Sequence, residues 1–103
     1  MTISVLLLGL TAVVVDEARE RIDLPDIEFH SGTGLADLRA VFAQGPVDHV
    51  IMGAGLDLGQ RLSIVREIFE TSDTTTVHLK DRASGPDAFL PFVRAVLTGL
   101  RGP

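Results

Sequence analysis

The feature that most constrains the fold is a continuous apolar run near the N-terminus. Residues Ile3–Leu8 are apolar except for Ser4, and Gly9 follows them. A strand with one face in solvent carries polar residues at every second position, whereas a strand covered on both faces does not. The run therefore predicts a central strand of a sheet that has helices on both faces.

The segment after this strand has two interpretations. A helix over Ala12–Ile22, with Thr11 as its N-cap, would place apolar residues on one side and charged residues on the other. Alternatively, the β-branched run Val13–Val15 disfavours a helix and would continue the first strand. The sequence leaves both interpretations open. The inward residues of the helix would be Val14, Val15, Ala18 and Ile22.

Three more strand–helix pairs follow. In the helix after the third strand, Leu62, Val65 and Phe69 form the main apolar stripe, with Ile64 and Ile68 beside it, so we expect it to be buried broadly. Asp57 is its expected cap. In the last helix, Pro91 must lie in the first turn or kink the helix. The predicted strands are Ile27–His30, Val47–Met52 and Thr74–Lys80, and the predicted helices are Leu35–Gln44, Leu58–Thr71 and Ala88–Leu100.

This β-α alternation, repeated four times, predicts right-handed crossovers and a parallel sheet. The first and third strands are apolar on both faces and belong in the centre, whereas the second and fourth alternate and belong at the edges. The predicted fold is α/β: one domain over residues 1–103, with a small doubly wound, flavodoxin-like sheet in the order 2-1-3-4.

Composition excludes several functions. The net charge is −5 and there is a single lysine, with no Trp or Tyr, so the chain lacks the basic patches and stacking rings of nucleic-acid binders. The absence of cysteine excludes disulfides and fits a cytoplasmic protein. The apolar residues 3–15 lack a basic start and are too few to span a bilayer, so we expect neither a signal peptide nor a membrane partner.

Glycines, hydroxyls and cations gather in the loops that follow the strands. In an open parallel sheet these loops meet at one edge, where ligands bind, and helix N-termini there attract anions. The same residue types are also common in turns and helix caps, which explains each of them separately. The candidate residues for a phosphate or carboxylate ligand are Ser31, Thr33, Gly34, Gly53, Gly55, Lys80 and Arg82.

Catalytic and cofactor motifs are missing from the sequence. Neither the dinucleotide fingerprint, nor a P-loop, nor a nucleophile elbow occurs. His30 and His78 fall on opposite edge strands, about 14 Å apart, and His49 lies near the other end of its strand. We therefore expect no metal, no cofactor and no catalytic residue, which argues against an enzyme.

Two segments carry a resemblance to a known family. The segment Asp48–Gly53 is similar to the strand that ends in the phosphoacceptor aspartate of bacterial response-regulator receiver domains. The segment Lys80–Leu90 is similar to the end of the receiver's last strand, its lysine and its last helix. However, Gly53 stands at the phosphoacceptor position, Gly9-Leu10 replaces the acidic pair, and one β-α unit is missing. The resemblance implies a receiver-like domain that is not phosphorylated in the usual way and works through protein contacts.

Two functions follow as hypotheses. The first is a non-catalytic protein-interaction module, expected to be a homodimer, that uses the open edge of Thr74–Lys80 or the apolar last helix. The alternative is a small-molecule binder or enzyme that holds an anionic ligand at the glycine-rich edge of the sheet.

Overall fold

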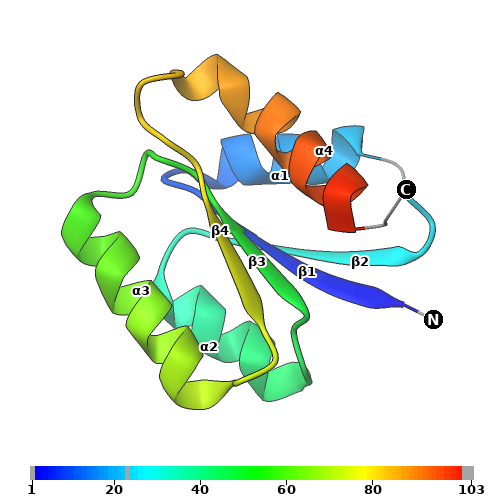
Figure 1. The fold of residues 1–103 in the computed structure, drawn as a ribbon, viewed down its shortest axis with the longest axis vertical. Helices are drawn as coiled ribbons and strands as arrows, with labels where there is room; N and C mark the ends of the chain where they lie inside the picture. Colours follow the sequence, from blue (N-terminus) through cyan, green and yellow to red (C-terminus); the bar gives the residue numbers. More distant parts are fainter. Residues whose placement is uncertain (1, 23, 101–103) are drawn as a thin grey trace.

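The computed structural model describes residues 2–22 and 24–100 (Figure 1). None of the helices in these ranges is long and apolar enough to cross a membrane. A short 3-10 turn, Pro86–Ala88, leads into the last helix. The predicted β-α alternation is confirmed. The elements are β1 (Ile3–Leu8), α1 (Ala12–Arg21), β2 (Ile27–Gly32), α2 (Leu35–Gln44), β3 (His49–Met52), α3 (Leu58–Thr71), β4 (Thr76–Leu79) and α4 (Phe89–Leu100).

The four strands are parallel and lie in the order β2-β1-β3-β4, as predicted. Figure 1 shows α1 and α4 on one face of the sheet and α2 and α3 on the other. The position of α1 opposite α2 and α3 follows from right-handed crossovers, because the connection from β1 to β2 runs in the opposite direction to the later ones. The last helix, α4, follows β4 and covers the sheet beside α1. The fold is therefore an α/β sandwich consistent with the flavodoxin-like class.

The core consists of two apolar layers, one on each face of the sheet. Val5 and Leu7 of β1 pack into the layer under α1 and α4, whereas Leu6 and Leu8 pack into the layer under α2 and α3. All four side chains are fully buried. This double burial is the reason that the first strand is apolar at nearly every position.

Residues Val13–Val15 are helical, which resolves the ambiguity of the sequence. Val15 and Ala18 are buried against the sheet, and burial of apolar area outweighs a helix propensity that costs only a few tenths of a kcal/mol per residue. Two expectations for α1 are wrong. Val14 is 43% exposed, because it lies beside a cavity rather than in the core. Thr11 occupies the N-cap position, but its side chain makes no capping hydrogen bond.

The expected apolar stripe of α3 is also wrong. Ile64 and Ile68 face the sheet and are buried, whereas Leu62 and Phe69 are 60% and 63% exposed. A helix on a sheet buries only the face turned toward it, and residues 100° or more around the helix stay outside. The cap is confirmed: Asp57 Oδ1 accepts a hydrogen bond from the Gln60 backbone N–H, at 2.8 Å.

Strand boundaries differ slightly from the predicted ones. β2 continues through Gly32, because its last residues pair with the end of β1. β3 and β4 are shorter at their starts, where side chains replace ladder bonds. The Asp48 carboxylate accepts a hydrogen bond from the Ser4 N–H, and the Thr75 hydroxyl donates to the Val47 carbonyl. Lys80 follows the end of β4.

Candidate functional site

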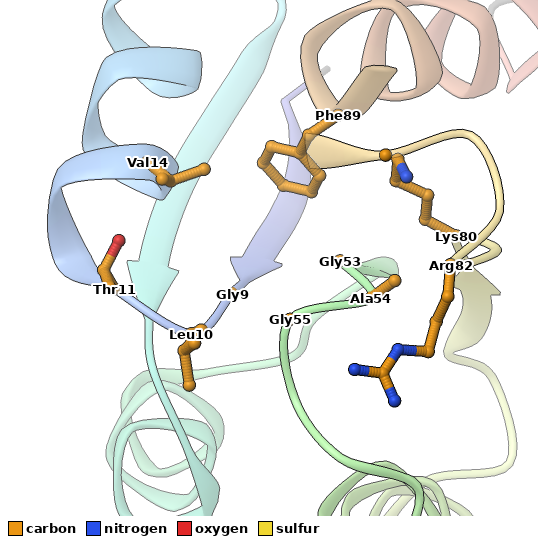
Figure 2. A pocket seen from close by; sticks show the side chains of 11 residues that line it. Gly9, Leu10, Thr11, Val14, Gly53, Ala54, Gly55, Lys80, Arg82 and Phe89 are labelled. Carbon is orange, nitrogen blue, oxygen red and sulfur yellow. The ribbon is translucent and has the colours of Figure 1, made fainter. Parts of the chain in front are cut away.

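A cavity of about 390 Å³ opens at the carboxyl ends of β1, β3 and β4 (Figure 2). The chain leaves β1 toward β2 at one edge of the sheet, and it leaves β3 toward β4 at the other edge. The loops after these two central strands therefore diverge, and the cavity lies between them. This is the position at which open parallel sheets bind ligands. The described residues that line it are Gly9, Leu10, Thr11, Val14, Gly53, Ala54, Gly55, Lys80, Arg82, Gly85 and Phe89.

Apolar side chains form one part of the wall. Figure 2 shows Leu10 and Val14 on the α1 side of the cavity and the Phe89 ring across from Val14. Two glycines allow this close packing. A Cβ atom on Gly53 would lie 3.2 Å from the Phe89 ring, and one on Gly55 would lie 2.8 Å from the Leu10 Cβ. A side chain at Gly55 would therefore force Leu10 to shift, and one at Gly53 would press on the Phe89 ring, whether or not a ligand is present.

Cationic side chains form the opposite part of the wall. Lys80 is only 3% exposed, and its ammonium donates a hydrogen bond to the Asp81 carbonyl at 2.9 Å. Arg82 is exposed at the mouth. Behind them, Arg61 of α3 donates from Nη1 to the Lys80 carbonyl at 3.1 Å. Within the part of the chain that the structure describes, none of these three cations lies within 4 Å of a carboxylate.

This lack of acidic partners contrasts with the rest of the surface. Four arginines outside the cavity form ion pairs, although Arg94 of α4 forms none with the residues that the structure describes. Four of the eight described cations therefore form an ion pair. Of the four that form none within the described part of the chain, three lie together near the end of β4. The ion pairs are Arg19–Asp16, Arg21–Glu17, Arg39–Glu67 and Arg66–Glu70.

Asp81 follows Lys80 directly but is engaged in its own loop. Its two carboxylate oxygens accept hydrogen bonds from the Ser84 backbone N–H and hydroxyl, at 2.9 Å and 2.8 Å. These bonds lower the pKa of Asp81, with a smaller contribution from the charge of Lys80. Gly85 then turns the chain with a φ of +78°, a conformation that favours glycine. Asp81 therefore fixes the loop that carries Arg82.

The two helix N-termini near the cavity differ in their capping. The first turn of α3 is closed by Asp57 and Gln60, which satisfy each other's backbone N–H groups. The first turn of α1 has no side-chain cap, and it borders the cavity through Thr11 and Val14. Its free N–H groups and the positive end of its dipole can therefore attract an anion.

The structure brings together four of the predicted ligand-binding residues and separates the other three. Gly53, Gly55, Lys80 and Arg82 line the cavity. Ser31, Thr33 and Gly34 lie at the end of the edge strand β2, on the far side of β1 from β3. The Ser31 hydroxyl donates to Asp16 Oδ1 at 2.6 Å, and the Thr33 N–H donates to Asp37 Oδ2 at 2.8 Å. Ligand binding by all seven residues stays a prediction.

Sequence reasoning missed the apolar part of the wall. Leu10, Val14 and Phe89 carry no signal that separates them from core residues, because each lies in or next to an apolar segment. Of the described lining residues, only Thr11 bears a hydroxyl, and none is a histidine or a carboxylate. The arrangement can hold an anion beside an apolar group, but it presents no nucleophile with an adjacent base.

A second polar cluster lies on the α4 face of the sheet, where β3 and β4 begin. His49 pairs with Thr76 in the register, and His78 lies two residues further along β4. The Thr76 hydroxyl contacts His49 Nδ1 and His78 Nε2, and the ring centroids are 6.1 Å apart. The sequence did not reveal this cluster, because it depends on the register between two strands.

Burial is the main cause that lowers the pKa of both histidines. The Asp48 carboxylate opposes this effect at His49, whereas the neighbouring His49 reinforces it at His78. No group of three or more metal-ligating side chains occurs among the described residues. The cluster is therefore a pair of rings that prefer their neutral form, joined by one hydroxyl.

The similarity to receiver domains stays a prediction of the sequence, and the structure shows the fold alone. Comparison of the chain with protein-family models, with curated proteins and with solved structures found no significant match.

Proposed function

We propose that this chain is a small protein-interaction module that forms a homodimer through one side of α3. The observation that carries this proposal is an exposed apolar row on that helix. Leu58, Leu62 and Phe69 are each exposed by 60% or more, and the partly buried Val65 lies between them. Four apolar residues on one short helix are more than the scattered apolar residues of an ordinary surface. We call Leu58, Leu62, Val65 and Phe69 the α3 flank.

The spacing within the α3 flank matches a surface that packs against another helix. The steps from Leu58 to Leu62, Val65 and Phe69 are four, three and four residues. Alternating steps of three and four form the narrow apolar seam by which two helices interlock in a coiled coil. A helix that packs only on its own sheet needs one apolar face, and α3 already has it in Ile64 and Ile68.

The α3 flank lies on the outer side of the fold. Glu67 forms an ion pair with Arg39 of α2, so that side of the helix is covered. Residues on the opposite side point away from α2, toward the open edge of the sheet at β4. Leu79 of β4 is also exposed. Among the described strands β4 pairs only with β3, so its outer edge is open to a partner on the same side of the molecule.

The partner that we propose for this surface is a second copy of the chain, because it carries the same apolar seam and no other protein is needed. Two identical seams can pack on each other about a two-fold axis, which is the most common symmetry of protein dimers. The last helix is less suited to this role than the sequence analysis expected. Phe89, Val93 and Leu97 are buried in the core, and its remaining large apolar residues are partly covered.

Analytical ultracentrifugation over protein concentrations from about 1 µM to about 1 mM tests the proposal. We expect a concentration-dependent dimer. Each of the variants Leu62→Glu and Phe69→Glu should raise the dissociation constant by about 100-fold, because burial of one such side chain contributes about 1.5–3 kcal/mol and a buried carboxylate adds a further cost.

The matched control is Val13→Glu on α1, which introduces the same charge at a 74% exposed valine away from the α3 flank. It should leave the dissociation constant unchanged. A chain that stays monomeric over the whole range would refute the proposal. A dimer that survives both α3 substitutions would place the interface elsewhere and also refute it.

A further inference from the structure

We propose that the cavity at the carboxyl ends of β1, β3 and β4 binds a small amphiphilic anion, a molecule with a compact apolar body and one carboxylate or phosphate group. The cavity has two chemically different sides, and each fits one half of such a ligand. This inference is independent of the α3 flank, with which the cavity shares no residue.

The apolar half of the ligand is matched by the α1 side of the cavity. Leu10 and Val14 are two of the large apolar side chains that the fold leaves exposed, and both line the cavity. Phe89 lies across from Val14, with its ring held against Gly53 (Figure 2). An apolar body placed between them would remove these exposed surfaces from water, which supplies most of the binding free energy in such pockets.

The anionic half is matched by Lys80 and Arg82. The Lys80 side chain is almost completely buried, yet its ammonium has three donors and makes one hydrogen bond, to the Asp81 carbonyl. A buried charge is stabilised by a close counterion. The Asp81 carboxylate interacts with the charge of Lys80 from further away, but among the described residues no carboxylate is within ion-pair distance of it. A ligand anion would supply a closer negative charge, and Arg82 at the mouth would add to the positive potential.

The uncapped first turn of α1 adds a third contribution to the positive potential. Its free N–H groups border the cavity beside Thr11, and the helix dipole is positive at this end. The N-terminus of α3 is less available, because Asp57 Oδ1 accepts from the Gln60 N–H, Gln60 Oε1 accepts from the Asp57 N–H, and the Asp57 carboxylate is itself negatively charged. The anion is therefore expected between the start of α1 and the end of β4.

The size of the cavity limits the apolar body. A volume of about 390 Å³ lies near the lower end of the ~300–1,000 Å³ that is typical of ligand pockets. A single aromatic ring or a short branched chain is compatible with this volume, and an extended dinucleotide is not.

A titration with four probes, followed by backbone amide chemical shifts, tests the assignment. 3-Phenylpropionate and phenyl phosphate combine both chemical features. 3-Phenyl-1-propanol has only the apolar body, and inorganic phosphate has only the charge. We expect at least one of the first two probes to shift the amides of Gly9, Gly53 and Gly55. The single-feature probes should bind about tenfold more weakly or not at all, because each loses one set of contacts.

Two substitutions at exposed positions test the two sides without disturbing the core. Arg82→Ala should weaken the better probe by about tenfold, as expected for the loss of one hydrogen bond to a charged group. Val14→Glu places a negative charge at the rim and should abolish binding of both anionic probes. The control is Arg94→Ala, which removes an arginine of α4 that is not among the residues lining the cavity; it should bind like the original chain.

The results separate the outcomes clearly. A preference for phenyl phosphate or for 3-phenylpropionate would identify the anionic group. If no probe shifts the cavity amides, or if Arg82→Ala and Val14→Glu both bind normally, the proposal is wrong. The same titration in the Leu62→Glu background keeps the result separate from any change in oligomeric state.

Discussion

Helices α3 and α4 flank β4 on opposite faces of the sheet, and they distribute their apolar residues differently. In α4, Phe89, Val93 and Leu97 are buried, and none of its large apolar residues is among the strongly exposed ones. In α3, one apolar stripe faces the sheet and a second faces outward. The helix with fewer apolar residues, α3, therefore exposes more of them to a partner, since the placement of apolar residues around the helix decides this.

At the open edge of the sheet, the two faces of β4 also differ in polarity. On the α3 face, β4 carries Val77, which packs into the core, and the exposed Leu79. On the α4 face, it carries Thr76 and His78, which form the polar cluster with His49. The edge is therefore apolar on one side and polar on the other, which favours the α3 side as the surface for association.

The largest expected effect is a difference in the free energy of unfolding between substitutions in the inner and the outer apolar stripe of α3. Ile68→Ala removes a fully buried side chain and should lower the free energy of unfolding by about 2–5 kcal/mol. Leu62→Ala, in the same helix, should change it by no more than about 0.5 kcal/mol at concentrations where the chain is monomeric. Urea denaturation of both variants measures this difference. Equal destabilisation by the two substitutions would contradict the division of α3 into an inner and an outer stripe.

A smaller effect is expected where α4 begins. Gly53→Ala places a Cβ 3.2 Å from the Phe89 ring, so either the ring or the start of α4 must move, at a cost of about 1–3 kcal/mol. Gly99→Ala, near the end of α4, meets no atom within 4 Å and should instead stabilise the helix by up to about 1 kcal/mol. Thermal unfolding of the two variants compares them. A neutral Gly53→Ala would show that Phe89 is not held against this glycine.

The smallest effect concerns the polar side of the edge and depends on pH. Burial lowers the pKa of His49 and His78 below the ordinary value of 6.5. The unfolded chain therefore takes up protons more readily than the folded chain, and the free energy of unfolding should decrease as the pH falls below 6.5. Denaturation between about pH 7 and about pH 5 measures this slope.

The double variant His49→Gln/His78→Gln is the comparison for this measurement and should show a shallower slope. If its slope equals that of the original chain, the two rings do not account for the pH dependence. Carrying out both measurements in the Leu62→Glu background separates folding from association.

The sequence by itself determined the order of elements and the order of the strands. The double-sided apolar pattern of β1 and β3 and the alternation in β2 and β4 reflect burial, and burial selects the central strands. It also determined that Gly53, Gly55, Lys80 and Arg82 would lie at one edge of the sheet, because the carboxyl ends of parallel strands meet there. These inferences depend only on local patterns and on the handedness of the crossovers.

Tertiary structure alone decided which residues of each pattern face inward and which partners they find. α3 has two apolar stripes, and only its position beside α2 shows that Ile64 and Ile68 are the inner one. The contact of Ser31 with Asp16 and the link of His49 to His78 through Thr76 join segments far apart in the chain. Such contacts depend on the register between strands and on how helices rotate as they pack. A single sequence does not specify either, because several registers and rotations satisfy the same pattern of apolar residues.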